Sequence, residues 1–165
     1  MTYTFGRMSP PSFLDRLAAP TPSPGGGSAA AYVGAMAAAL VEMCTGLSKL
    51  EEARARAEQL RRDLEALVEE DAAAFSAYLT TKSDEALKRA TLVPLLIAEK
   101  SAEVLLLAQG AAPKVSKAAL PDLKGAMRFA GAASEHAAAT ARYNLQEVTD
   151  KDFVQDTRLR LLRIP

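Results

Sequence analysis

Hydrophobic residues recur at steps of three and four along most of the chain, and this spacing predicts an all-α protein. No run of β-branched residues alternates with polar ones, so no strand is expected. The pattern predicts a bundle of four long helices with a short helix near each end of the chain. The expected helices cover about 9–18, 28–47, 51–80, 83–109, 121–148 and 151–162.

The expected helix 28–47 is apolar almost all round because alanine and glycine fill it. Small residues leave two of its faces nearly flat, which lets neighbouring helices approach closely. A helix of this kind is central in a soluble protein, or is buried partly by another subunit. We therefore expect it to be the central helix of a single domain that spans 1–165.

Residues that start or stop helices mark several expected boundaries. Pro94 falls inside the fourth long pattern and predicts a kink or break about one turn upstream, because proline lacks an amide donor and clashes with the preceding turn. Gly110 followed by Pro113 predicts the end of that helix. Ser28 and Asp122 are both residue types that cap helix N-termini, and each stands where a long helix is expected to begin.

Composition excludes several functional classes. The 165 residues carry 20 basic and 20 acidic side chains, so the net charge of zero gives no basic surface for nucleic acid. One histidine and one cysteine supply no plausible zinc site. The unpaired Cys44 and the absence of a signal-peptide pattern in 1–7 indicate a cytoplasmic protein. The apolar run 29–41 is too short to span a bilayer, so no membrane partner is expected.

Three consecutive glycines, in the segment 24–28, stand directly before the alanine-rich helix. Ordering glycine is entropically costly, so the run indicates backbone held close to another group. The first helical amides could bind an anion or polar ligand there. A flexible elbow beside Pro20, Pro22 and Pro24 explains the same composition and is slightly favoured by the residues alone. No Lys-Ser or Lys-Thr follows the glycines, so the segment is not a phosphate loop.

Asp71 places a carboxylate on the apolar side of the third long helix, in line with Leu67, Val68 and Phe75. Such a charge is costly unless it is paired, hydrogen-bonded or next to a cavity. It is a candidate general acid or base, because burial raises a carboxyl pKa. A structural ion pair with a lysine or arginine of another helix explains the position equally well. Asn144 similarly puts an amide on the packed face of the last long helix, where it needs a partner.

Four segments resemble, in order, those of the formiminotetrahydrofolate cyclodeaminase and methenyltetrahydrofolate cyclohydrolase family. They are the Pro-Gly-Gly-Gly-Ser-Ala segment in 20–31, Asp71-Ala72-Ala73-Ala74-Phe75, Ala90-Thr91-Leu92-Val93-Pro94-Leu95 and Arg142-Tyr143-Asn144-Leu145. In addition, Pro121-Asp122-Leu123-Lys124 stands where relatives have Ser-Asp-Ala-Gly.

The resemblance implies an all-helical homodimer with a folate-binding cleft near the glycines. It implies a tetrahydrofolate derivative as substrate and proton transfer without a metal, either to hydrolyse a methenyl bridge or to close a ring with loss of ammonia. Asp71 is then the first candidate for acid/base catalysis and Asp122 the second. The expected substrate-binding residues are Pro24, Gly25, Gly26, Gly27, Ser28, Arg142 and Asn144.

Cyclohydrolase is preferred to cyclodeaminase, because no formiminotransferase domain accompanies this one in the sequence. The alternative is a non-catalytic helical dimer of the same fold that binds folate or another anion. A coiled-coil adaptor is less compatible, because the apolar pattern follows a globular bundle instead of a sustained heptad.

Overall fold

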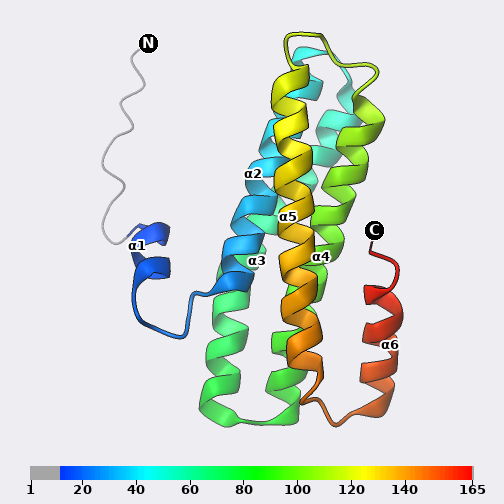
Figure 1. Ribbon diagram of the computed structural model, residues 1–165. Coiled ribbons are helices and arrows are strands. Elements are labelled where there is room, and N and C mark those ends of the chain that lie inside the picture. The colour runs from blue at the N-terminus through cyan, green and yellow to red at the C-terminus, as the bar shows by residue number, and fades with distance from the viewer. Residues whose placement is uncertain (1–11, 165) are drawn as a thin grey trace.

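The computed structural model describes residues 12–164, and within that range it contains six helices and no strand (Figure 1). The helices are α1 (Phe13–Ala18), α2 (Gly26–Leu47), α3 (Glu51–Thr81), α4 (Asp84–Ala111), α5 (Leu120–Leu145) and α6 (Lys151–Leu161). The four long helices α2 to α5 alternate in direction and form an antiparallel bundle, with α6 beside α4 and α5. The predicted all-α bundle with short terminal helices is confirmed.

The prediction of α2 as the single central helix is not confirmed, because α4 also contacts the other three long helices; α2 packs against α3, α4 and α5. Its small residues allow this: Ala31, Ala37 and Ala38 are completely buried, and a Cβ on Gly34 would lie only 2.6 Å from the Ser101 hydroxyl of α4. The predicted start of α2 is wrong by two residues. Gly25 is the N-cap and Ser28 lies in the first turn, since the Ser28 hydroxyl bonds to another helix instead of capping its own.

Helix α4 continues through Pro94 as one element, so of the predicted kink or break the break is wrong. It also continues through Gly110 and ends at Ala111, two residues after the predicted end. Pro94 is completely buried, so packing on both sides holds the helix together where its own hydrogen bonding is interrupted. Ser83 caps the N-terminus by accepting a hydrogen bond from the amide of Ala86.

The other helix ends also differ slightly from the sequence pattern. α5 begins at Leu120 after the N-cap Ala119, so Asp122 is not a cap but an acidic residue of the first turn, where it suits the helix dipole. α5 ends at Leu145, three residues before the predicted end. α1 begins after Ser12, and the part of its predicted range at 9–11 lies outside the described residues.

The lengths of the four long helices differ, and this difference shapes one end of the bundle. With a rise of 1.5 Å per residue, the 22 residues of α2 span about 33 Å, whereas the 31 residues of α3 span about 46 Å. The N-terminus of α2 therefore stops partway along the bundle (Figure 1). Beyond it, α3, α4 and α5 continue as three helices, and the chain segment before α2 lies against them.

Candidate active site

A cavity of about 240 Å³ lies at the first turn of α2, where the bundle changes from four helices to three. Its wall comes from the segment before α2 and from α2, α3, α4 and α5. The lining residues are Pro22, Ser23, Gly25, Gly26, Gly27, Asp71, Phe75, Ala90, Thr140, Tyr143 and Asn144. Residues from all four family-like segments thus meet at one place, and the third segment contributes only its first residue, Ala90.

Asp71 is the buried charged group of this cavity, with only 8% of its surface exposed. The Ser28 hydroxyl donates a hydrogen bond of 2.8 Å to its Oδ2 atom. No lysine or arginine forms an ion pair with Asp71 in the described part of the chain. The structure therefore favours a carboxylate that faces a cavity over a structural ion pair.

Burial raises the pKa of the Asp71 carboxyl above its ordinary value, because the charged form loses water. Hydrogen bonds from the hydroxyl and the backbone amide of Ser28 oppose this rise without cancelling it. The carboxylate also lies against the N-terminal turn of α2, where the helix dipole favours negative charge. Asp71 is thus held as a proton acceptor of increased basicity beside an open space.

The glycine segment packs closely against Asp71, so it is part of the cavity wall and not a flexible elbow. A Cβ on Gly27 would lie 2.3 Å from Asp71 Oδ1, so the α2 backbone approaches the carboxylate more closely than any other residue type allows. The Ser23 hydroxyl donates a hydrogen bond of 3.0 Å to the Ala72 carbonyl, which ties the segment to α3 beside Asp71. The group that the glycines approach is therefore the chain's own carboxylate.

Asn144 lies in the cavity wall, as the sequence predicts for it, and its Nδ2 atom donates a hydrogen bond of 2.8 Å to the Ala90 carbonyl of α4. Sequence reasoning missed its neighbours Phe75, Thr140 and Tyr143 as lining residues. Helical spacing could have found the first two, because Phe75 follows Asp71 by four residues and Thr140 precedes Asn144 by four.

Four of the predicted site residues do not line this cavity. Ser28 is completely buried and contacts Asp71 instead, and Pro24 is absent from the wall although its neighbours belong to it. Arg142 stands two residues from Asn144, about 200° around α5, and faces cavities formed with α4 and α6. Asp122 is exposed in the first turn of α5, about 33 Å along the helix from Asn144. Within one chain, Asp122 cannot act together with Asp71.

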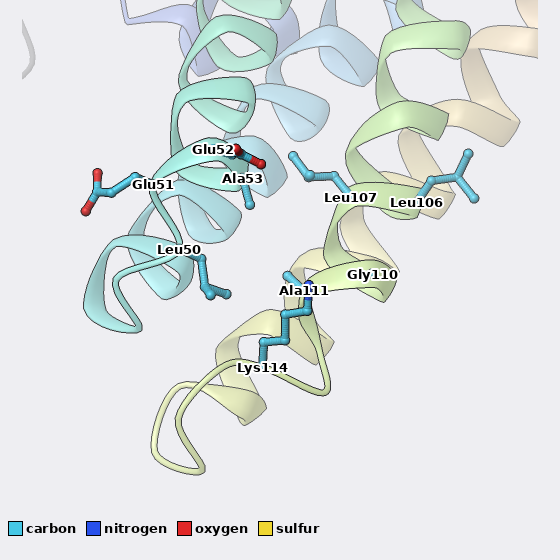
Figure 2. A pocket seen from close by; sticks show the side chains of 9 residues that line it. All are labelled: Leu50, Glu51, Glu52, Ala53, Leu106, Leu107, Gly110, Ala111 and Lys114. Atoms are coloured by element: carbon cyan, nitrogen blue, oxygen red, sulfur yellow. The ribbon is translucent and has the colours of Figure 1, made fainter.

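A larger cavity of about 550 Å³ lies at the opposite end of the bundle, between the start of α3 and the end of α4. Figure 2 shows Leu50, Ala53 and Leu107 around this space, with Lys114 at its edge and the carboxylate of Glu51 turned away. None of its lining residues is a buried acidic or basic group. Residues 12–164 also contain no group of three or more His, Cys, Asp or Glu side chains placed to hold a metal ion. Of these two cavities, the one at Asp71 is the one whose described lining includes a buried charged side chain.

Known proteins resemble this chain in sequence and in fold. A family model described as formiminotransferase-cyclodeaminase matches residues 10–162. The chain belongs to the formiminotransferase-cyclodeaminase family. A member of related sequence, a methenyltetrahydrofolate cyclohydrolase from Methylorubrum extorquens, is 33% identical over 172 residues, which cover 88% of this chain and 83% of the relative.

The formiminotransferase-cyclodeaminase fold is also found in a solved structure. The crystal structure of formiminotetrahydrofolate cyclodeaminase from Thermotoga maritima matches with a TM-score of 0.88 and 25% identity, covering 94% of this chain and 87% of that one. Both relatives are named for reactions of tetrahydrofolate one-carbon units. The family inferred from the four sequence segments is confirmed.

Proposed function

We propose that this protein is a methenyltetrahydrofolate cyclohydrolase that acts in the cytoplasm. The observation that carries the proposal is the buried carboxylate of Asp71, which has no ion-pair partner within residues 12–164 and faces a cavity at the first turn of α2. The methenyltetrahydrofolate cyclohydrolase of Methylorubrum extorquens supports the choice of reaction, because it is 33% identical over most of both chains.

The proposed reaction adds water to the methenyl carbon that bridges two nitrogens of the folate. A C–O bond forms while Asp71 takes one proton from the water, so the attacking oxygen becomes a stronger nucleophile. One C–N bond of the resulting tetrahedral carbon then breaks. The departing nitrogen takes a proton from Asp71, the carbinol oxygen loses its own proton to solvent, and a formyl group remains. A carboxyl group whose pKa is raised by burial is suited to both transfers.

The remaining cavity residues are suited to a flat, polar ring system. Phe75 and Tyr143 give the wall two aromatic side chains, and 71% of Tyr143 is exposed, so its ring is accessible to a ligand. Asn144 supplies an amide, and the backbone amides of Gly26 and Gly27 lie in a first helical turn, where they have no acceptor within the helix. A bicyclic folate ring has the apolar faces and polar edges that these groups recognise.

Formiminotetrahydrofolate cyclodeaminase is the second candidate, favoured by the fold match to the Thermotoga maritima enzyme. In that reaction, one folate nitrogen attacks the formimino carbon and ammonia leaves after it receives a proton. Asp71 would then act first as a general acid. Both reactions pass through a tetrahedral carbon, so the same cavity serves either one.

The exposed side of α2 supports a homodimer. Tyr32, Met36, Met43 and Leu47 are exposed large apolar residues of this helix, and Glu42 is its one charged residue. By length and composition α2 is the one described helix that could cross a membrane, but half of the relevant window is already buried in the bundle, as in the core helix of a soluble protein. We infer that a second copy of the chain covers the exposed side.

The decisive test follows loss of the methenyl absorbance at neutral pH, with spontaneous hydrolysis subtracted. The wild-type protein is expected to accelerate the reaction, and Asp71→Asn is expected to lower turnover by roughly two to four orders of magnitude, the usual contribution of a general acid or base. Turnover should also fall as the pH drops through the raised pKa of Asp71. Ser28→Ala should move this fall to higher pH, because it removes a hydrogen bond that favours the charged carboxylate.

Ser134→Ala is the matched control for the hydroxyl deletion, because Ser134 is also buried and donates to a carbonyl, that of Ala98, away from the cavity. It should leave the pH profile unchanged. Absence of acceleration with the methenyl compound, together with ammonia release from the formimino compound, would reject cyclohydrolase in favour of cyclodeaminase. Inactivity with both compounds would support the non-catalytic alternative.

A further inference from the structure

Pro94 leaves one backbone carbonyl of α4 without its ordinary amide donor. This carbonyl lies one turn earlier in the helix, on the cavity wall. In an α-helix the amide of residue 94 would donate to the carbonyl of Ala90, but proline has no amide hydrogen. The side chain of Asn144 makes the missing bond instead, through Nδ2 at 2.8 Å. A buried carbonyl needs a donor, so α4 and α5 are joined here by a side-chain amide.

This bond fixes the orientation of the Asn144 amide. A carbonyl oxygen can only accept, so the amide must present Nδ2 to Ala90 and its own oxygen must point away from that carbonyl. Ala90, Asn144 and Asp71 all line the same cavity of about 240 Å³. Asp71 and Asn144 thus give the cavity wall a carboxylate and an amide from different helices, and Oδ1 is the Asn144 atom left to accept a hydrogen bond from a ligand.

We propose that Pro94 is a positioning residue for catalysis: the carbonyl that it frees turns the Asn144 amide so that Oδ1 accepts a hydrogen bond from the attacking water. This inference rests on the proposed cyclohydrolase function. The water donates one hydrogen to Asn144 Oδ1 and gives the other to Asp71 as its oxygen bonds to the methenyl carbon. The hydrogen held by Asn144 stays on the new carbinol oxygen. Two acceptors on one water orient its lone pair toward carbon, which a single base does not do.

The variant that isolates this role is Pro94→Ala, because Pro94 is buried and does not line the cavity. The new amide of residue 94 competes with Asn144 for the Ala90 carbonyl. We expect kcat to fall about tenfold, the effect of roughly one hydrogen bond, while KM stays within about twofold. The midpoint of urea unfolding should not decrease, because alanine is the better helix residue. A purely structural proline would give the opposite result, with lower stability and unchanged kcat.

Ser101→Ala is the control for a small change inside α4. Its hydroxyl is buried, has no hydrogen-bond partner among the described residues and lies outside the cavity wall. We expect wild-type kcat and KM from this variant. If Pro94→Ala also keeps wild-type kcat while Asn144→Ala loses activity, Asn144 acts without help from Pro94 and the proposal is overturned.

A readout that needs no catalysis separates this inference from the proposed function. In the wild-type protein, one side-chain amide proton of Asn144, identified in the NMR spectrum by its loss in Asn144→Ala, should exchange slowly with solvent. In Pro94→Ala it should exchange faster. Fast exchange already in the wild type would overturn the positioning role. Slow exchange in a wild-type protein that hydrolyses no methenyl compound would reject the proposed function and still support the fixed amide.

Discussion

At the scale of single residues, the properties that suit Asp71 to proton transfer also lower the stability of the folded state. Its pKa is raised in the folded chain, because burial disfavours the charged form. Between the unfolded and the folded pKa values, the folded state binds more protons than the unfolded state, so stability falls as the pH rises through that interval. Above both pKa values the full penalty is present.

Asp71→Asn is therefore expected to be more stable than the wild type at neutral pH, although the same substitution is expected to lower turnover. Asp63→Asn on the same helix should show the opposite sign. The Lys100 side chain donates a hydrogen bond to Asp63 and lowers the pKa of its carboxyl, so this charge stabilises the folded state above the unfolded pKa. Urea unfolding at pH 5 and pH 8 checks both signs. Equal effects of the two substitutions would contradict the assignment of Asp71 as a desolvated carboxylate.

The sequence was sufficient to place Asp71 and Asn144 on the packed faces of their helices, but not to name their hydrogen-bond partners. An acidic or amide side chain on an apolar helix face is visible from helical spacing alone. The donor to Asp71 is Ser28, which is 43 residues away, and the acceptor for Asn144 is a backbone carbonyl 54 residues away. Ser28 is a typical capping residue, so the local rule assigned its hydroxyl to its own helix. Only tertiary packing shows that the hydroxyl is used elsewhere.

At the scale of elements, the three glycines before and within α2 are not equivalent. A Cβ on Gly25 would meet its nearest neighbour at 3.7 Å, an ordinary contact. A Cβ on Gly26 would meet the imidazole of His136, an exposed side chain that can rotate away. A Cβ on Gly27 would meet the buried Asp71 carboxylate, which has no such freedom.

Gly27→Ala is thus expected to reduce turnover by at least about a hundredfold, because it pushes the general base out of position. Gly26→Ala should keep turnover within a few fold of the wild type, with the same added methyl group one residue earlier. Steady-state kinetics on both folded variants, verified by circular dichroism, provide the comparison. A Gly27→Ala protein of normal activity would show that the carboxylate does not need its observed place.

The boundaries of α4 show that packing between helices overrides local sequence signals for a helix end. Pro94 and Gly110 are both residues that end helices in isolation, yet α4 passes through each of them. At Pro94, the side chain of Asn144 takes the hydrogen bond that the helix loses. This compensation comes from α5, so the pattern within α4 could not reveal it.

At the scale of the whole molecule, the uncovered side of α2 predicts a dimer in solution. Met36→Lys should shift the protein from dimer to monomer at micromolar concentration, because it places a charge in the centre of the proposed interface. Leu159→Lys is the control, since Leu159 is a similarly exposed apolar residue on α6. Sedimentation velocity distinguishes the two states. A wild-type protein that sediments as a monomer would refute the proposed interface.

The bundle as a whole was predictable from apolar spacing, whereas a cleft near the glycines was expected only from the family resemblance. Apolar spacing gave four long helices of nearly correct length, including an α2 shorter than α3. Where each helix begins along the bundle axis depends on packing between helices, which spacing within one helix does not encode. That alignment of the helices along the bundle axis brings together Gly27, Asp71, Ala90 and Asn144.

Because α2 is shorter than α3, the molecule has a four-helix part and a three-helix part that can change separately. Large, completely buried side chains such as Leu60, Leu64, Ile97 and Leu123 lie along the part of the bundle that α2 fills, and they secure the fold. The Asp71 cavity lies where the three-helix part begins, and its lining includes little of that core. Substitutions there can retune the chemistry of the cavity with small effects on folding. The same helical bundle can thus serve relatives that are named for opposite reactions, one that opens a ring and one that closes it.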